Sequence, residues 1–342
     1  MSKVRMALIG FGRFGQEHAK AIASSSHAEL VGVAARTEAT CREATLMFGV
    51  PATTEYRRLT AREDVDAVDI VLPTDLHENA VVEALRSGKH VLVEKPMAIT
   101  VSQCDRILVE ASSGNLTLCV NFELRSSTLW GRVKKDIEKG VVGEPLHGSF
   151  DLWRFPFRRG SEAWRYTQER VGSWTHEEPI HYLDAALWFF ESLGSPDQIT
   201  SHAIGRDGAS VELSDNTTQL LRWPGGQFFQ ISGSNSLFGY HQQLRIVGEE
   251  GSIAVVWEGS DESAEEGRQD YFIVNNGRRH RVPIRARSTE PLDLQRNIDA
   301  FCARVSGRDA DIATGEDGRR SIALVEAALL SARSGTPAKL SL

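Results

Sequence analysis

A glycine-rich hexapeptide near the N-terminus is the feature that most constrains the fold. Residues 10–15 read GFGRFG, and they follow an apolar run, Val4 to Ile9, that has the length and composition of a buried strand. Helix-forming residues from His18 to Ala23 come next. A glycine turn between a strand and a helix is typical of the phosphate-binding turn of a βαβ unit. The sequence therefore predicts that the first part of the chain binds a dinucleotide.

The same alternation of strand and helix continues for about a third of the chain. Strands are predicted at residues 4–9, 29–34, 67–72, 90–93 and 116–121, and helices at 18–23, 38–48, 77–87 and 101–112. Strands that alternate with helices form a parallel sheet covered by helices. We therefore expect an α/β Rossmann domain, with a doubly wound parallel sheet, over residues 1–121.

The pattern changes after residue 122. A predicted helix at 129–139 is followed by segments such as HGSFDLWRF, TTQLLRW, GQFFQISG, QLRIVG and GSIAVVW, which read as strands separated by glycine turns. Further helices are predicted at 180–193 and 321–332, and the acidic stretch at 260–270 reads as a solvated loop. Residues 122–342 therefore predict a second, α+β domain with a largely antiparallel sheet.

Composition narrows the class of protein. Hydrophobic residues make up 41% and charged residues 25% of 342 residues, as in a soluble globular protein of two domains. The formal charge of -7, without long blocks of one sign, does not favour a nucleic-acid partner, and no apolar run approaches the roughly 20 residues that span a bilayer. The four cysteines are far apart and the N-terminus leaves no room for a signal peptide. We therefore expect a cytoplasmic protein without disulfides or a metal site.

Each glycine of the hexapeptide has a physical role. The first allows the tight turn, the second lets the backbone approach a pyrophosphate, and the third permits close packing of the helix on the strand. The helix N-terminus then attracts the negative charge of the phosphates. We expect the cofactor to contact Gly10, Phe11, Gly12, Arg13, Phe14 and Gly15.

The end of the second predicted strand bears on the choice between NADP and NAD. An acidic residue is expected about 20 positions after the glycines, where it binds the ribose hydroxyls of NAD. Ala35 stands there instead, followed by Arg36 and Thr37, which suit a 2'-phosphate. The prediction is NADP. NAD remains open, because Arg36 could stack on the adenine of either cofactor and Glu38 could turn inward as the missing acid.

Three longer segments resemble one family. They are GFGRFG, the PTDLH segment at 73–77, and above all GKHVLVEKPMAIT, whose Glu94-Lys95-Pro96 follows a predicted strand. They are similar to the Gfo/Idh/MocA oxidoreductases, and the likeness extends over nearly the whole chain. The resemblance implies a Rossmann domain followed by an open-faced, largely antiparallel sheet that is often an oligomer interface. A homodimer or homotetramer is thus expected.

The resemblance also implies which residues carry the chemistry. Lys95 and His181 would face the substrate carbon beside the nicotinamide. A histidine can take and return a hydroxyl proton near neutral pH, and the lysine ammonium can stabilise the developing alkoxide. Other residues expected at the cofactor are Pro73, Thr74, His77 and Glu94, with His77 bracing the loop rather than reacting. Because Pro96 follows Lys95, a cis peptide bond is possible there.

A second group of residues is expected at the substrate. Glu177 and Asp184 stand at i-4 and i+3 from His181, so the three side chains would share one helix face. Glu177 replaces an aspartate that is usual in the family, so the substrate cannot be copied from relatives. Arg154, Trp164 and Arg165 belong to a stretch rich in arginine and aromatic residues, which suits an anionic sugar or polyol. A solvated loop or a subunit contact would use the same residues.

These observations favour one function and leave two alternatives. The favoured function is an NADP-preferring dehydrogenase or reductase acting on a secondary alcohol or ketone of a sugar, inositol or related polyol. The first alternative is an oxidoreductive glycosidase that oxidises the ring, eliminates the aglycone and then returns the hydride. The second is a non-catalytic protein that senses the cofactor, against which the retention of Lys95 and His181 argues.

Overall fold

The chain divides into two compact units. The computed structural model describes residues 3–235, 239–261, 264, 267–284 and 288–342. The first unit comprises Met1–Ser126 and Pro291–Arg319, and the second comprises Ser127–Glu290 and Arg320–Leu342. The expected division into residues 1–121 and 122–342 was continuous in sequence. The structure differs because a late segment folds with the first unit.

The first unit is built on a six-stranded parallel sheet with the strand order β3-β2-β1-β4-β5-β6. Its strands are β1 (Val4–Ile9), β2 (Ala28–Ala34), β3 (Ala52–Thr53), β4 (Ala67–Ile70), β5 (His90–Glu94) and β6 (Leu118–Asn121). Its helices are α1 (Arg13–Ser24), α2 (Glu38–Phe48), α3 (Arg57–Thr60), α4 (His77–Arg86) and α5 (Val101–Gly114), with short 3-10 turns at Thr74–Leu76 and Glu123–Ser126. The predicted doubly wound parallel sheet is confirmed.

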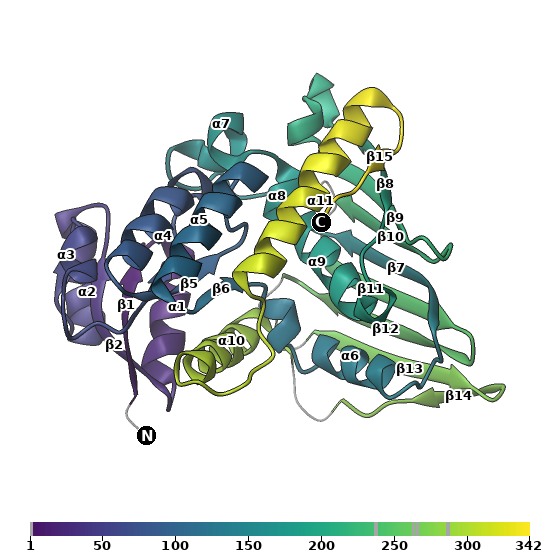
Figure 1. The fold of residues 1–342 in the computed structure, drawn as a ribbon, viewed down its shortest axis with the longest axis horizontal. Coiled ribbons are helices and arrows are strands. Elements are labelled where there is room, and N and C mark those ends of the chain that lie inside the picture. The colour runs from purple at the N-terminus through teal and green to yellow at the C-terminus, as the bar shows by residue number, and fades with distance from the viewer. Residues whose placement is uncertain (1–2, 236–238, 262–263, 265–266, 285–287) are drawn as a thin grey trace. The chain divides into compact units, whose positions relative to one another are not determined.

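Helices cover the sheet of the first unit, so its strands are buried and read as apolar runs. Figure 1 shows α4 and α5 side by side in blue, and the Arg86–Glu110 and Arg106–Glu78 ion pairs join them.

Helix α10 (Glu290–Val305) explains the unexpected unit boundary. No pattern in the sequence predicted this helix. Its apolar residues Leu294, Ile298 and Phe301 are fully buried in one hydrophobic cluster with Met6 and Leu8 of β1. Burying such side chains contributes about 1.5–3 kcal/mol each. The cluster therefore holds this late segment against the start of the chain.

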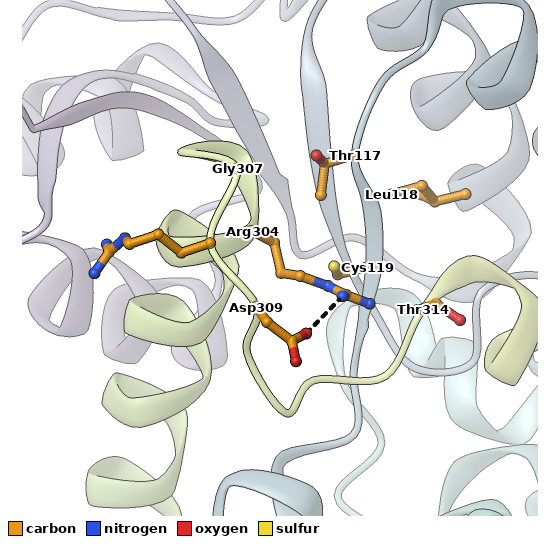
Figure 2. A pocket seen from close by; sticks show the side chains of 8 residues that line it. Thr117, Leu118, Cys119, Arg304, Gly307, Asp309 and Thr314 are labelled. Atoms are coloured by element: carbon orange, nitrogen blue, oxygen red, sulfur yellow. Dashed lines mark hydrogen bonds and ion pairs between the residues drawn. The ribbon is translucent and has the colours of Figure 1, made fainter.

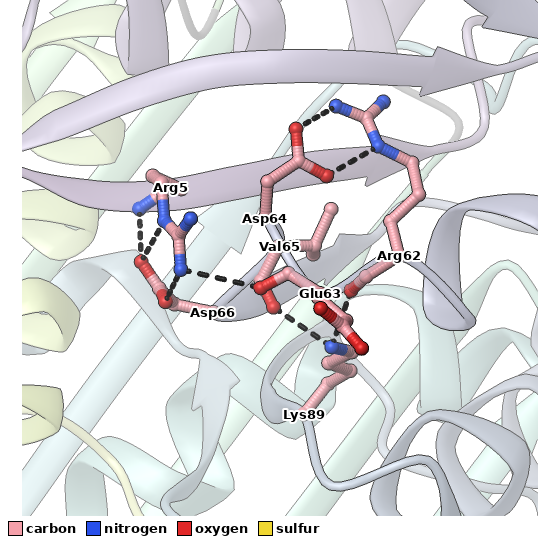
Figure 3. A network of polar contacts seen from close by, with 7 residues as sticks. All are labelled: Arg5, Arg62, Glu63, Asp64, Val65, Asp66 and Lys89. Carbon is pink, nitrogen blue, oxygen red and sulfur yellow. Dashed lines mark hydrogen bonds and ion pairs between the residues drawn. The ribbon is translucent and has the colours of Figure 1, made fainter.

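A polar network stabilises the amino ends of the strands in the first unit (Figure 3). The ammonium group of Lys89, just before β5, donates hydrogen bonds to the carbonyl oxygens of Arg62 at 2.7 Å and Val65 at 2.9 Å. Arg5 of β1 forms an ion pair with Asp66 at 2.6 Å. The network satisfies backbone groups at the edge of the sheet opposite the carboxyl ends, where ligands bind in this fold.

The second unit contains a nine-stranded sheet with the order β14-β13-β12-β11-β7-β10-β9-β8-β15. Its strands are β7 (Pro145–Trp153), β8 (Gln198–Ile204), β9 (Asn216–Arg222), β10 (Phe228–Ser234), β11 (Tyr240–Gly248), β12 (Gly251–Gly259), β13 (Arg268–Asn275), β14 (Arg278–Arg281) and β15 (Ala338–Lys339). All neighbouring strands with a described register run antiparallel except β7 and β10. The predicted, largely antiparallel sheet is confirmed.

The second unit contains helices and short 3-10 turns besides its sheet. The helices are α6 (Trp130–Glu138), α7 (Gln168–Val171), α8 (Trp174–Glu177), α9 (Pro179–Phe189) and α11 (Gly315–Ser334, which begins in the first unit), with 3-10 turns at Ser161–Tyr166, Glu191–Leu193, Arg206–Gly208 and Val211–Leu213. The ring of Phe150 on β7 lies 4.9 Å from Trp130 of α6 and 4.5 Å from Tyr182 of α9. Phe150 therefore joins both helices to the sheet.

The opposite face of the sheet leaves large apolar side chains exposed. Trp153 on β7 is 44% exposed and Phe228 on β10 is 40% exposed, and each stacks on a histidine of the sheet. The loop was predicted at 260–270, but β13 begins at Arg268, so the last three of these residues belong to that strand. Residues 262–263 and 265–266 lie outside the described residues. Across the described ranges, no helix has the length and apolarity needed to cross a bilayer.

Candidate active site

The glycine loop between β1 and α1 has the tight geometry that its sequence predicts. Gly10 has a φ of 108°, and a Cβ atom there would lie 2.0 Å from the carbonyl oxygen of Val71, after β4. A Cβ atom on Gly15 would lie 2.1 Å from the carbonyl oxygen of Gly10. Neither position accepts a side chain. The loops after β1 and β4 thus lie against each other where the strand order reverses, which is the ligand-binding point of this fold.

The N-terminus of α1 fits the phosphates of a dinucleotide. Gly12 is the N-cap of α1, and a Cβ atom placed on it would meet nothing within 4 Å. The first turn of α1 carries no acidic residue. Free backbone N–H groups and the helix dipole favour an anion at such a position. The residues present therefore fit a pyrophosphate, which Gly12 would let approach the backbone.

The residues that follow β2 bear on the choice between NADP and NAD. Ala35 is buried and Arg36 is exposed beside it. Thr37 is the N-cap of α2, since its hydroxyl accepts a hydrogen bond from the backbone N–H of Thr40 at 3.2 Å. Glu38 is exposed and accepts a hydrogen bond from the Thr54 hydroxyl at 3.5 Å. The Thr37 hydroxyl thus caps α2. Arg36 is a positively charged side chain just after the end of β2.

The Glu94-Lys95-Pro96 turn follows the carboxyl end of β5. The peptide bond between Lys95 and Pro96 is cis, as the proline allowed. His77, at the first position of α4, contacts two carbonyl oxygens at 2.8 Å, that of Pro96 through Nδ1 and that of Leu72 through Nε2. His77 therefore braces two loops, and Pro73 and Thr74 lie in the loop that it holds.

Sequence reasoning missed the residues that surround Glu94. The imidazole of His18, on α1, lies between Asp69 of β4 and Glu94 of β5, and all three are buried. The side-chain amide of Asn121 also donates a hydrogen bond to Glu94. The available signal was a carboxylate inside an apolar parallel strand, because a buried charge needs partners. Asp69 in the run AVDI is such a residue.

The predicted helix face of His181 is wrong in one respect. His181 and Asp184 lie on α9, but Glu177 ends the separate helix α8, and the Glu178 backbone between them is not helical. The reason is Pro179, which has no N–H to continue the hydrogen bonding of α8 and instead begins a new helix. All three side chains are buried, and Asp184 accepts a hydrogen bond from the hydroxyl of Ser321 at 3.3 Å.

The predicted substrate arginines each contact a carboxylate. Arg165 donates from Nε to Glu177 at 2.7 Å, and its guanidinium stacks over the Trp164 ring at 4.4 Å. Arg154 donates to Glu178 and lies 4.9 Å from the ring centre of Phe157. Charge-assisted pairs of this kind fix both partners and offset their charges. The second unit thus presents guanidinium and carboxylate groups together rather than a patch of positive charge.

A polar cavity of about 480 Å³ lies elsewhere in the first unit. Figure 2 shows its lining, in which Arg304 contacts Asp309 at 3.3 Å. The other residues that line it are Thr117, Leu118, Cys119, Gly307, Arg308 and Thr314. Because Thr117 and Leu118 stand at the amino end of β6, this cavity is not at the carboxyl ends of the strands. Among the described residues, no group of three or more His, Cys, Asp or Glu side chains could hold a metal ion.

Comparisons with known proteins agree with this geometry. A family model described as "Oxidoreductase family, NAD-binding Rossmann fold" matches residues 4–122, and its partner, "Oxidoreductase family, C-terminal alpha/beta domain", matches residues 134–340. The chain is 28% identical over 338 residues to the inositol 2-dehydrogenase of Rhizobium meliloti (strain 1021), which is 96% of each chain.

Two further proteins extend the comparison. The chain is 37% identical over 243 residues to the dTDP-3,4-didehydro-2,6-dideoxy-alpha-D-glucose 3-reductase of Streptomyces violaceoruber, covering 69% of this chain and 67% of that protein. The structure of aldose-aldose oxidoreductase from Caulobacter crescentus, complexed with glycerol, matches 99% of this chain and 100% of its own with a TM-score of 0.86. Its identity of 21% makes this a likeness of fold. The chain belongs to the Gfo/Idh/MocA family of oxidoreductases, as its sequence motifs predicted.

Proposed function

We propose that this protein is a dehydrogenase or reductase that moves a hydride between a nicotinamide cofactor and a secondary alcohol or ketone of a sugar, inositol or related polyol. The observation that carries the proposal is the glycine loop, whose backbone leaves room for phosphates at the N-terminus of α1. The inositol 2-dehydrogenase relative supports action on CH–OH groups.

The preferred cofactor in this proposal is NADP. Ala35 brings no carboxylate to repel a 2'-phosphate, and the exposed guanidinium of Arg36 is suited to bind one. Glu38 is the one acid near the end of β2 that could serve NAD, and it accepts a hydrogen bond from Thr54. When bound, the nicotinamide would supply the hydride chemistry, and the protein would supply positioning and charge.

Lys95 and His181 have complementary roles in the proposal. The ammonium group of Lys95 polarises the substrate oxygen and stabilises negative charge on it as the C–H bond breaks. The imidazole of His181 accepts the hydroxyl proton during oxidation and returns it during reduction. His181 is 4% exposed on a helix that is buried along its whole length, which holds the ring in one place.

The substrate that we propose is neutral. The sequence suggested an anionic sugar because of Arg154 and Arg165, but each contacts a glutamate. A paired guanidinium and carboxylate offer a donor and an acceptor, which suits two neighbouring hydroxyl groups. Trp164 is 8% exposed, and its indole ring stacks on one side of the Arg165 guanidinium.

A panel of substrates tests the proposal. It contains neutral sugars, uronic acids, inositols, glycosides and a thymidine-diphosphate ketosugar, the last because of the Streptomyces violaceoruber relative. Each is incubated with NADP, NAD or the reduced forms while absorbance and products are followed. Net reduced cofactor from a free polyol supports a dehydrogenase, and net oxidised cofactor from a ketosugar supports a reductase. Sugar release from a glycoside without net cofactor change would instead support the glycosidase alternative.

Replacing Lys95 separates catalysis from cofactor sensing. Lys95→Ala should lower kcat by about 100-fold or more while the cofactor still binds. The control is Lys20→Ala, which removes an exposed ammonium from the same unit. An active protein that Lys95→Ala leaves unchanged would refute the role of Lys95, and a protein that binds cofactor but turns over no member of the panel would favour the sensor alternative.

We also propose that the protein is a homodimer or homotetramer. The exposed apolar side chains of the nine-stranded sheet, among them Trp153 and Phe228, support this, because monomers rarely expose large apolar patches. Sedimentation of the wild type and of Trp153→Asp measures it. The variant should dissociate, and a monomeric wild type would refute it.

A further inference from the structure

His18 occupies the centre of a buried ionic network that the proposed function does not use. Its side chain is 0% exposed, and it projects from α1, one turn after the last residue of the glycine loop. Nδ1 lies 2.7 Å from a carboxylate oxygen of Asp69, and Nε2 lies 3.0 Å from a carboxylate oxygen of Glu94. One imidazole therefore bridges two carboxylates from neighbouring strands, β4 and β5.

This arrangement favours a doubly protonated ring. An ionised carboxylate only accepts hydrogen bonds, so an imidazole between two ionised carboxylates is most stable with a proton on each nitrogen. Burial raises the pKa of Asp69, and the charge of His18 acts against that rise. Burial alone would lower the pKa of His18, but Asp69 and Glu94 together raise it to about 10. Burial acts to raise the pKa of Glu94, yet His18, Lys95 and Asn121 outweigh it, and the net pKa is lowered. Both groups are thus charged near neutral pH.

Glu94 is held from its other side as well. Asn121, the last residue of β6, donates a hydrogen bond to the same Glu94 oxygen that faces His18. The side-chain amide of Asn297 on α10 donates to Oδ1 of Asn121 at 2.5 Å, and the hydroxyl of Ser126 donates to Oδ1 of Asn297 at 2.8 Å. These contacts all lie within the first unit. Together they restrict the conformation of the Glu94 side chain, and with it the start of the Glu94-Lys95-Pro96 turn.

Two further contacts involve the glycine loop (residues 10–15, which we call the phosphate loop) and Pro96, the residue after Lys95. The ring of Phe14, within the phosphate loop, packs edge to face on the His18 ring with 4.8 Å between centroids. On the far side of Lys95, the carbonyl oxygen of Pro96 lies 2.8 Å from Nδ1 of His77. The residues before and after Lys95 are therefore each held by a buried histidine, one from α1 and one from α4.

We propose that His18 is a positioning residue for Lys95: it clamps Glu94 against Asp69 and thereby couples the phosphate loop to the lysine that polarises the substrate. The inference rests on the proposed function for the role of Lys95. It assigns no proton transfer to His18, which lies in the protein interior. Glutamine cannot replace it, because a glutamine amide donates to one carboxylate but presents its carbonyl oxygen to the other.

Steady-state kinetics of His18→Gln test the inference against a purely structural role. We expect kcat to fall by about tenfold or more, since small displacements of a catalytic group are costly, while the Kd for the cofactor changes by less than about threefold. The matched control is His27→Gln, the same substitution at an exposed position of this unit, with kcat unchanged. A lower melting temperature for His18→Gln with an unchanged kcat at low temperature would show a structural role only.

A double-mutant cycle asks whether His18 acts through Glu94. In a Glu94→Gln background, adding His18→Gln should change kcat by less than about twofold, because the ionic contact between His18 and Glu94 is already lost. Independent losses that multiply in the double variant would overturn the inference.

Nuclear magnetic resonance gives a readout that does not depend on activity. In ¹⁵N-labelled protein without cofactor, His18 should show two ring N–H signals at about pH 8, where an ordinary histidine is neutral. Methyl groups added to lysines by reductive ¹³C-methylation report on Lys95, assigned with Lys95→Arg. That signal should move in His18→Gln and stay in His27→Gln.

The magnetic resonance results separate the two proposals. If no substrate is turned over, the proposed function fails while the coupling of His18 to Lys95 is still measured. A neutral His18 ring at pH 8 in the wild type, or a Lys95 signal that ignores His18→Gln, would overturn the inference.

Discussion

The guanidinium of Arg165 and the carboxylate of Glu177 are joined by a hydrogen bond of 2.7 Å, and the glutamate is 4% exposed. Glu177 stands where the family resemblance led us to expect an aspartate, and its side chain reaches the arginine. Since buried carboxylates are stable only when paired, the two residues form one ion pair whose net charge is near zero. This pairing is the basis of the neutral substrate that we propose.

Removing the charge of Glu177 should change substrate preference. In Glu177→Gln the Arg165 guanidinium loses its counter-charge, so kcat/KM for neutral polyols should fall about tenfold and the ratio of uronic acid to neutral sugar should rise. Kinetics with a sugar and its uronate measure this ratio. Glu169→Gln, at an exposed position nearby, should leave the ratio unchanged. An unchanged ratio in Glu177→Gln would place the pair away from the substrate.

Arg36 should decide between the two cofactors. Arg36→Ala removes the cation beside the 2'-phosphate, so the KM for NADP should rise about tenfold or more while the KM for NAD changes by less than about twofold. Initial rates with each cofactor test this, with Arg42→Ala, an exposed arginine of α2, as the control. Equal losses with both cofactors would instead indicate that Arg36 stacks on the adenine.

Lys89 should matter for stability and not for catalysis. Lys89 is 9% exposed, and its ammonium group donates to two backbone carbonyl oxygens. Lys89→Met fills a similar volume but leaves both carbonyls without this donor, so the free energy of unfolding should fall by about 2–4 kcal/mol. Urea unfolding measures the loss, and Lys20→Met, at an exposed position, should lose less than about 0.5 kcal/mol. If Lys89→Met unfolded at the same urea concentration as the wild type, water would be replacing the ammonium group as the donor to the two carbonyl oxygens.

Asp317 should make stability depend on acidity. It accepts hydrogen bonds from the backbone N–H and hydroxyl of Thr314 at 2.9 Å and forms an ion pair with Arg125 at 3.1 Å. Burial acts to raise the pKa of Asp317, but Arg125 and Thr314 outweigh it and lower the pKa. A lowered pKa in the folded state gives stability that is present above the unfolded value of about 4 and is lost as the pH falls through the folded value.

Thermal unfolding at several pH values tests this sign. At neutral pH, Asp317→Asn should be less stable than the wild type by about 1–2 kcal/mol, because the amide still accepts hydrogen bonds but no longer attracts Arg125. The difference should shrink as the pH drops below about 4. Glu316→Gln, in the same first turn of α11 but exposed, controls for the helix dipole. A difference that does not depend on pH would rule out the charge of Asp317 as the cause.

Much of the first unit could be read from local sequence alone. The run Val4–Ile9, the helix at Glu38–Phe48 and the order of strands and helices were predicted because buried parallel strands are continuous apolar runs and glycine loops have a fixed place between strand and helix. The family was recognised for the same reason, since Glu94-Lys95-Pro96 and the glycine loop are contiguous motifs. The separation of Glu177 from the helix of His181 was also readable, because Pro179 stood in the sequence.

Tertiary structure decided what depends on residues far apart in the chain. Helix α10 belongs to the first unit because Ile298 and Phe301 are buried with β1. No local sequence pattern predicts this contact. His18, Asp69 and Glu94 are separated by 51 and 25 positions, and parallel strands with intervening helices bring an oxygen of each carboxylate within 3.0 Å of a ring nitrogen of His18. The amino-acid sequence determines which side chains can carry a charge. Only packing, which removes water and sets their neighbours, decides that two carboxylates and one imidazole share the interior.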